Sequence, residues 1–423
     1  MNVLIVGSGA KEYTLARLMK TYENVDLVFV APGNDAMSEF ATCIDIKAND
    51  VDELLEFAKA NEIDLTVACS EKAIECGIAD KFNEAGLMIF APSIDAAKIA
   101  ISKSAGKKFM YKTKIPTPKF GIFDRENMAV DYARKSPMPL LIKTDNHQTG
   151  ENVVVCESFK TAKRVIEEIF DSQNKKLVME DYVQGQEFSY YVITDGYNAM
   201  PLTSVVPYKY SLNGDGGLVT SGMGAYSPFY MINHEIERRI FKEIIYPALD
   251  ELGRNNNQYI GILGVDIVLD KNGRLNVLEF NPFLKEPDAE CVFALITENF
   301  ADLMRAAVMG TLTDVFPEIR IKHQYAVSVV LTSGNYPVSG KSGCKIKGLD
   351  EIDEEIITAH YNTVKNENQD YETTGGRTLS LTACGATLES AAEKVYENVK
   401  SIQFDSKKCR TDIGRVLPSR FQL

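Results

Sequence analysis

Several features of secreted, zinc-binding and nucleic-acid-binding proteins are missing from this sequence. The eight cysteines of the 423-residue chain form no Cys-x-x-Cys pair and no zinc-like spacing, so we expect them to be reduced and buried. The N-terminus has no basic segment, and its apolar run is too short for a signal peptide or a membrane span. The formal net charge of −13 disfavours a nucleic-acid surface. We therefore expect a cytoplasmic protein without nucleic-acid or membrane partners, which holds anionic substrates through local lysines, arginines, metal or backbone N–H groups.

The chain is long enough for more than one domain, at roughly 100 to 200 residues per domain, and it has no long low-complexity linker or internal repeat. Up to about residue 101, apolar runs alternate with helical stretches, which is typical of a doubly wound α/β domain. A mixed α+β unit follows the lysine-rich segment 102–118. From about residue 325, short strands and one amphipathic helix predict a small α+β domain. The predicted domains are 1–101, 102–324 and 325–423.

The first strand ends in Gly7-Ser8-Gly9, and a helical stretch follows. Glu12 stands where a dinucleotide-binding motif would have its third glycine, so a packed turn that can hold a phosphate is the better interpretation. Parallel strands bring their carboxyl ends to one edge. We expect residues 7–12, 32–34 and 69–71 to meet there.

Residues 260–282 predict a hairpin, because two apolar runs flank a turn that contains Asn272-Gly273. On the second strand Glu279 and Asn281 should share one face, while Leu278 and Phe280 point to the other. A carboxylate and an amide oxygen on one face suit Mg²⁺. The alternative is an ordinary hairpin with a polar face.

The glycine-rich segment 211–228, SLNGDGGLVTSGMGAYSP, is expected to be a long loop that faces the substrate rather than a regular element.

Taken together, the motifs of the chain resemble those of the phosphoribosylamine–glycine ligase family of the ATP-grasp superfamily. The motifs are GSGAKEY, APGN, IFAPS, SKSAGKKFM, SGMGAYSP, VLEFN, SGNYP, GGRTLSLTACG and RTDIG, and they run through the whole chain. The resemblance implies an N-terminal doubly wound α/β domain, a central ATP-grasp domain and a small C-terminal α+β domain.

The resemblance also implies a two-step reaction in purine biosynthesis that uses ATP with Mg²⁺ or Mn²⁺. The carboxylate of glycine attacks the γ-phosphate of ATP, and the amine of 5-phosphoribosylamine then attacks the acyl phosphate. The products are glycinamide ribonucleotide, ADP and phosphate. Phosphoryl transfer of this kind depends on positioning and charge neutralisation. We expect a monomer or a homodimer, and the sequence does not distinguish between them.

Site residues are carried over by position. The implied catalytic residues are Lys143, Glu279 and Asn281, of which Glu279 and Asn281 would also bind the metal. The implied ATP-binding residues are Lys103, Lys143, Glu180, Asp181, Tyr182, Val183 and Glu187. The implied substrate-binding residues are Gly9, Glu12, Asn34, Glu71, Gly222, Met223, Gly224, Glu286 and Arg377.

The chain departs from the family pattern in the motifs that are expected to contact ATP and the substrates. Glu151 replaces a lysine of the loop at 144–152, and Phe283 replaces an arginine that would bind a carboxylate or phosphate. Asp266 stands where the family has an apolar residue or glycine. Because other ATP-grasp ligases place a metal-binding carboxylate on that strand, it is a third candidate metal ligand.

These departures leave two alternatives to the default substrates. In the first, the chain ligates a different amino acid or amine, and Leu218, Val219 and Phe283 form an apolar patch that favours this substrate. If the substrates are instead the default pair, Lys285, Lys209 or Lys11 would supply the positive charge of the lost arginine. In the second, Glu151 marks a nucleotide-binding relative without catalytic activity.

Overall fold

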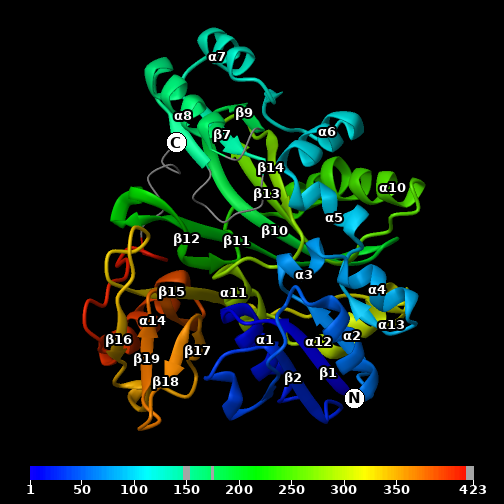
Figure 1. Ribbon diagram of the computed structural model, residues 1–423, viewed down its shortest axis with the longest axis vertical. Coiled ribbons are helices and arrows are strands. Elements are labelled where there is room, and N and C mark those ends of the chain that lie inside the picture. The colour runs from blue at the N-terminus through cyan, green and yellow to red at the C-terminus, as the bar shows by residue number, and fades with distance from the viewer. Residues whose placement is uncertain (146–152, 173–175, 416–423) are drawn as a thin grey trace.

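The N-terminal part of the chain forms a parallel sheet with helices on both faces. The computed structural model describes residues 1–145, 153–172 and 176–415, and this sheet lies at the bottom of Figure 1. Its order is β3-β2-β1-β4-β5, with strands β1 Asn2–Gly7, β2 Leu27–Pro32, β3 Thr42–Cys43, β4 Leu65–Ala68 and β5 Ile89–Phe90. Val3 and Ile5 pack in one core with α1, Ala10–Met19, while Leu4 and Val6 pack in the opposite core with α2, Val51–Ala60. This alternation is the predicted doubly wound arrangement.

Of the remaining helices of this region, α3 Glu71–Glu75 and α4 Ile78–Glu84 pack on the N-terminal sheet, and α5 Ile94–Ile101 and α6 Lys103–Thr113 lead to the rest of the molecule. The region also contains the short turn η1, Met37–Glu39. Ser102 caps α6 by accepting the N–H of Ala105, and Asp145 accepts the N–H of Ser104 at 2.7 Å. Lys103 is thereby fixed at the start of a helix tied to the end of strand β7, Leu140–Thr144.

A four-stranded antiparallel sheet with two helices forms the top of the molecule in Figure 1. The order is β6-β9-β7-β8, with β6 Phe120–Phe123, β7 Leu140–Thr144, β8 Val153–Cys156 and β9 Leu177–Asp181. The helices α7, Glu126–Lys135, and α8, Phe159–Asp171, supply Ala129, Ala162 and Ile166 to its own small core.

An eight-stranded antiparallel sheet crosses the middle of the molecule and continues into the C-terminal region. Its order is β14-β13-β10-β11-β12-β15-β20-β17, with β10 Gly185–Asp195, β11 Ala199–Leu212, β12 Gly216–Ser227, β13 Ile260–Asp270, β14 Leu275–Asn281, β15 Tyr325–Ser333, β17 Ile357–His360 and β20 Gly376–Gly385. Because β12 pairs with β15, the hydrogen bonding continues across the position predicted as a domain boundary at 324/325.

The other elements cover this sheet. They are α9 His234–Ile240, the π-helical turn η3 Phe241–Ile245, α10 Tyr246–Arg254, α11 Asp288–Leu295, α12 Phe300–Val308, α13 Leu312–Val315 and α14 Leu388–Ser401; the 3₁₀ turn η4 Leu349–Glu351; and a small sheet of β16 Ser342–Lys345, β18 Thr363–Lys365 and β19 Tyr371–Thr374. Helix α11 is buried along its length and packs against α1, β12 and β15. Among the described residues, no helix is both long and apolar enough to cross a membrane.

The prediction of a long loop at 211–228 is wrong. Most of this segment is strand β12, and the turn between β11 and β12 is only Asn213–Asp215, η2. Two of the glycines, Gly222 and Gly224, lie where other segments pack closely against β12. Gly222 has φ of +115°, and a Cβ there would come within 2.7 Å of Pro287 Cδ.

Candidate active site

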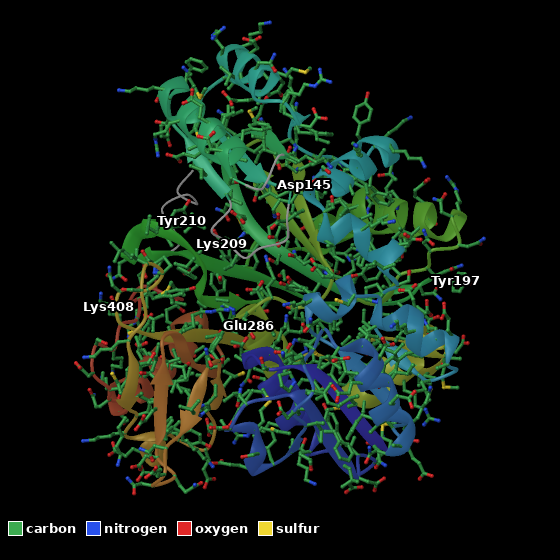
Figure 2. All side chains as sticks on the ribbon, in the orientation of Figure 1. Asp145, Tyr197, Lys209, Tyr210, Glu286 and Lys408 are labelled. Atoms are coloured by element: carbon green, nitrogen blue, oxygen red, sulfur yellow. The ribbon has the colours of Figure 1, made fainter. Side chains whose placement is uncertain are left out.

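A cavity of about 530 Å³ is lined by residues from the N-terminal sheet, the four-stranded sheet and the eight-stranded sheet. Figure 2 places Lys209 and Glu286, two of its lining residues, near the middle of the molecule. The lining comes from segments far apart in the sequence, namely residues within 7–12, 70–72, 141–143, 180–187, 207–222 and 266–288, together with Ala48, Lys103, Val153, Val155 and Arg377. This volume is within the range of small-molecule sites.

Most of the residues predicted from the sequence line this cavity. They are Gly9, Glu12, Glu71, Lys103, Lys143, Glu180, Asp181, Tyr182, Val183, Glu187, Gly222, Asp266, Glu279, Asn281, Glu286 and Arg377. Three predicted substrate residues lie beside it. Asn34 donates a hydrogen bond to the Ser8 carbonyl at 2.9 Å, Met223 is buried, and Gly224 packs against Ile413 and the Ser328 carbonyl. Glu151 lies outside the described residues, so its predicted effect stays a prediction.

Two buried lysines share one carboxylate at the end of the cavity formed by β7 and β9. Lys143 Nζ lies 2.9 Å from Glu180 Oε1, and Lys107 Nζ lies 2.8 Å from Oε2. Burial would raise the pKa of Glu180, but the two lysines lower it below its usual value. Burial lowers the pKa of Lys107 to about 8. Since the side chain of Glu180 is committed to these lysines, the backbone of 180–183, and not that side chain, would contact a nucleobase at this edge.

The hairpin of β13 and β14 brings three polar side chains together. Asp266 pairs with Glu279 and Gly264 pairs with Asn281, so Glu279 and Asn281 share the cavity face as predicted. The prediction that Leu278 points to the opposite face is wrong. The register shifts by one residue between Asp266 and Ile267, and this bulge turns Leu278 toward the cavity beside Glu279.

Glu279 and Asn281 each keep one oxygen available for a metal ion. Lys103 Nζ lies 2.9 Å from Glu279 Oε2, and the Asn281 amide N–H donates to Asp266 Oδ1 at 3.1 Å. Burial would raise the pKa of Glu279, but Lys103, Lys143 and Lys209 lower it far below its usual value, so the carboxylate is ionised. Hard oxygens of this kind fit Mg²⁺. No group of three or more His, Cys, Asp or Glu suited to a metal is found in the described part of the chain, so water and phosphate would supply the other ligands.

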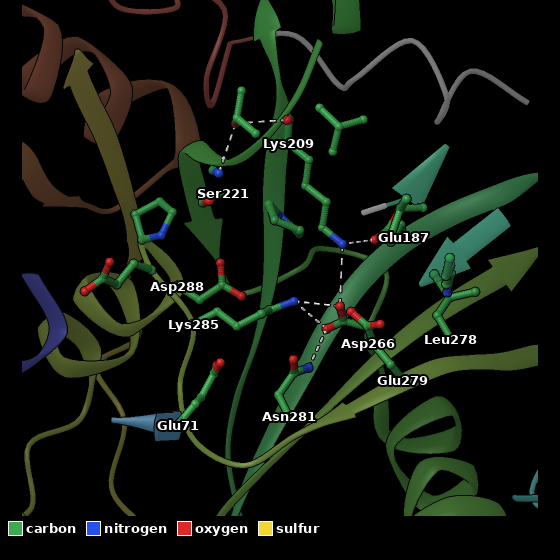
Figure 3. Close-up of a pocket in the computed structure, with 18 of the residues that line it drawn as sticks. Glu71, Glu187, Lys209, Ser221, Asp266, Leu278, Glu279, Asn281, Lys285 and Asp288 are labelled. Atoms are coloured by element: carbon green, nitrogen blue, oxygen red, sulfur yellow. Dashed lines mark hydrogen bonds and ion pairs between the residues drawn. The ribbon is translucent and has the colours of Figure 1, made fainter. Parts of the chain in front are cut away.

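Asp266 is surrounded by hydrogen-bond donors, as the dashed lines of Figure 3 show. Lys285 Nζ lies 2.6 Å from both of its carboxylate oxygens, the Ser189 hydroxyl donates to Oδ1 at 2.8 Å, and Lys209 Nζ lies 3.5 Å from Oδ2. Lys209 also forms an ion pair with Glu187. The side chain of Asp266 is 2% exposed. A metal ion at Asp266 would therefore have to displace Lys285.

The N-terminal turn is filled by carboxylates of the chain itself. The N–H of Gly9 donates to Glu12 at 2.8 Å, and the N–H of Lys11 donates to Glu286 at 3.1 Å. Arg377 donates to the other oxygen of Glu286 at 2.8 Å. Burial raises the pKa of Glu12 to about 7. A phosphate at this turn would have to replace Glu286.

Among the described residues, the cavity lining carries more acidic than basic side chains. The basic ones are Lys11, Lys72, Lys103, Lys143, Lys209, Lys285 and Arg377, and the acidic ones are Glu12, Glu71, Glu180, Asp181, Glu187, Asp266, Glu279, Glu286 and Asp288. The two sets nearly balance, so the cavity offers no large positive field to a polyphosphate. Divalent cations would have to supply that charge.

The apolar patch expected from Leu218, Val219 and Phe283 is not formed. Phe283 is 3% exposed and packs with neighbouring Leu284 in the large core beside the N-terminal sheet, whereas Leu218 is 53% exposed. Of the three, Val219 lines the cavity. Phe283 anchors the segment after β14 and is not a substrate contact.

Some functional neighbours were not found from the sequence. Lys107 lies one helical turn after Lys103 on α6, and that spacing was a usable signal for two lysines on one face. Tyr191 donates to Asp288 at 2.7 Å, and no motif in the sequence pointed to this contact.

The sequence comparisons cover the chain from end to end. Family models described as phosphoribosylglycinamide synthetase match the N domain at residues 1–100, the ATP-grasp (A) domain at 101–291 and the C domain at 326–416. A phosphoribosylamine–glycine ligase of Clostridium acetobutylicum is 34% identical over 98% of this chain and 100% of its own length. One from Neisseria meningitidis serogroup A is 33% identical over 98% and 99%.

Solved structures agree in fold. A phosphoribosylamine–glycine ligase of Thermotoga maritima has a TM-score of 0.83 at 24% identity, covering 97% of this chain and 100% of its own. A complex of biotin carboxylase with beta-gamma-ATP, from Campylobacter jejuni, has a TM-score of 0.73 at 16% identity, covering 96% of this chain and 92% of its own.

The fold and the matched domain models define an ATP-grasp ligase, with the predicted N-terminal α/β, central ATP-grasp and C-terminal domains. Within that class, the full-length similarity is specific: the chain belongs to the phosphoribosylamine–glycine ligase family.

Proposed function

We propose that this protein joins glycine to 5-phosphoribosylamine as ATP is cleaved to ADP and phosphate, in the de novo synthesis of purines. The observation that carries the proposal is the placement of Glu279 and Asn281 on one wall of a cavity that also holds Lys103 and Lys143. Full-length similarity to phosphoribosylamine–glycine ligases supports the choice of substrates.

The nucleotide end is assigned to the region of β7 and β9. Lys143 and Lys103 bind phosphate oxygens there, while the backbone of 180–183 lines the base and Glu187 binds the ribose hydroxyls. The buried position of Lys143 beside Lys107 supports this role, because a desolvated cation interacts strongly with phosphate.

Glu279 and Asn281 hold Mg²⁺ or Mn²⁺. When bound, the cation neutralises negative charge on the phosphate oxygens. Glu279 is ionised and fixed by Lys103, and Asn281 is oriented by its N–H bond to Asp266, so both oxygens are ready before the metal arrives. Asp266 stays a prediction as a third ligand.

The reaction needs two displacements. A carboxylate oxygen of glycine forms a bond to the γ-phosphorus as the bond to ADP breaks, and Lys103 and Lys143 balance the charge of the transferring group. The amine of 5-phosphoribosylamine then forms the amide bond, loses a proton and releases phosphate. Gly9, Glu12, Asn34, Glu71, Gly222, Met223, Gly224, Glu286 and Arg377 are proposed to form the acceptor end.

A different acceptor amine is the second candidate, because carboxylates already occupy the N–H groups of the N-terminal turn. ADP release with glycine and 5-phosphoribosylamine, compared with a panel of other amino acids and amines, tests both. Turnover with the default pair at least tenfold more efficient than with any other pair is expected. No turnover with the default pair would contradict the proposal. The domain boundaries, the cytoplasmic location and the monomeric or homodimeric state remain predictions.

A further inference from the structure

Lys285 occupies a distinctive position between the two ends of the cavity. It follows β14 and reaches from the side of Asp288 to the carboxylate of Asp266, where Asn281 also binds (Figure 3). Its side chain is 22% exposed and lines the cavity. The ammonium is therefore next to the proposed metal-binding amide and still open to a ligand.

The backbone that carries Lys285 is held firmly. Phe283 and Leu284, directly before it, are buried in the core, and the carbonyl of Lys285 accepts the N–H of Ala289 at the start of α11. The side chain is fixed at its other end by the bidentate contact with buried Asp266. Such a side chain loses little conformational entropy when a ligand binds.

The ammonium group has donor capacity left. A lysine has three N–H donors, and two point to the oxygens of Asp266. The third is available for an anionic oxygen, as a charge-assisted hydrogen bond. Two other lysines near this wall are also paired with carboxylates, Lys103 with Glu279 and Lys209 with Glu187, and Lys103 is already assigned to phosphate.

We infer that Lys285, held in place by Asp266, binds the carboxylate of the amino-acid substrate and sets the specificity for a free carboxylate next to the metal site. In this proposal Asp266 is a positioning residue for Lys285, and this role replaces the sequence-based prediction that Asp266 is a third metal ligand. The inference rests on the proposed function, which identifies the amino acid as glycine. It assigns the residue that binds the carboxylate of glycine, which the proposed function does not name.

The test measures binding as well as turnover. Equilibrium dialysis of labelled glycine against the complex with Mg²⁺ and ADP gives the Kd for the native protein and for Lys285→Met. We expect the Kd for glycine to rise at least tenfold, with the Kd for Mg²⁺ and ADP changed less than twofold. Lys285→Arg keeps the charge and should recover most of the affinity. Lys271→Met, which removes the same charge from the exposed turn of the same hairpin, is the control and should change neither Kd.

Lys285→Met could destabilise the fold, because it leaves the buried carboxylate of Asp266 without its closest cation. A second variant therefore controls for misfolding. The double variant Asp266→Asn/Lys285→Met removes both charges of the pair, and its Kd for glycine should be raised by the same factor. An unchanged Kd in both variants would overturn the inference. A Mg²⁺ concentration for half-maximal turnover that rises at least tenfold in Asp266→Asn would also overturn it, because Asp266 would then be a metal ligand.

The failure of the proposed function is a separate result. If the native protein binds another amino acid but not glycine, the substrate proposal fails, and the same variants tested with that amino acid decide the role of Lys285. If the native complex binds no carboxylate of the panel, the inference fails as well.

Discussion

At the scale of single residues, the site depends on how each charge is paired. Glu279 is held by Lys103, and Lys143 is held by Glu180, so these charges have fixed positions before any ligand binds. Fixed charges cost no reorganisation when a phosphate arrives. The chemistry of these residues could be predicted from their types and spacing, but their partners are brought together by the fold.

Glu279→Gln should lower turnover at least a hundredfold, equivalent to about 2.7 kcal/mol of barrier. The change removes the negative charge from the metal site and keeps the shape of the side chain. ADP release gives the rate, and the thermal midpoint provides the control for folding. A variant that is folded and within tenfold of native activity would contradict the metal assignment.

Glu290 gives the protein a dependence of stability on pH. It is fully buried, accepts from Tyr361 at 3.1 Å, and burial raises its pKa to about 8. A carboxyl whose folded pKa is raised stabilises the fold below its unfolded pKa of about 4.5, and this stability is lost as the pH rises toward 8.

The prediction is made with Glu290→Gln, which resembles the protonated acid in shape. Between pH 5 and 8 the native protein should lose more free energy of unfolding than the variant, by at least about 1 kcal/mol. Urea denaturation at several pH values measures this difference. Parallel curves for the two proteins would show that Glu290 is ionised throughout.

At the scale of elements, two local features escaped the sequence patterns for physical reasons. Period-two alternation places Leu278 opposite Glu279, but the bulge in β14 inserts one residue and turns Leu278 to the cavity. Glycines normally weaken strands, yet at Gly222 and Gly224 of β12 a Cβ would clash with Pro287 and Ile413. Neither the bulge nor the packing is encoded in the local pattern, because both depend on the partner strand or segment.

Gly222→Ala should destabilise the protein by about 2 kcal/mol or more. A Cβ at this position meets Pro287 Cδ at 2.7 Å and the Glu286 carbonyl at 2.9 Å, in addition to the strain of φ at +115°. Gly214→Ala is the matched control, since it also has positive φ, +63°, but nothing within 4 Å of its Cβ. It should cost about 1 kcal/mol. Urea denaturation measures the free energy of unfolding of both variants. Equal losses in the two variants would show that the close contact at Gly222 does not destabilise the fold.

At the scale of the whole molecule, the cavity is built where the three predicted domains meet. The doubly wound arrangement of the N-terminal sheet and the presence of the hairpin at 260–282 could be predicted, because both follow from hydrophobic periodicity and turn residues. The continuity of β12 with β15, and the packing of α11 against α1, could not, since they join segments far apart in the sequence.

The nearly balanced charges of the lining predict that ATP binds well only with a divalent cation. Mg²⁺ and ATP together should raise the thermal midpoint, because a ligand at 100 times its Kd adds about 2.7 kcal/mol of stability. With a chelator in place of Mg²⁺, the rise should be largely lost. Differential scanning calorimetry measures both conditions. An equal rise without metal would contradict the roles of Glu279 and Asn281.

The measurement that tests the central claim most directly follows oxygen from the amino acid into the product. Glycine labelled with ¹⁸O in its carboxylate is incubated with the intact protein, ATP, Mg²⁺ and 5-phosphoribosylamine, and the products are examined by mass spectrometry. Attack on the γ-phosphate through an acyl phosphate predicts one labelled oxygen in the released phosphate and one in glycinamide ribonucleotide. Unlabelled phosphate, or the absence of glycinamide ribonucleotide, would contradict the account.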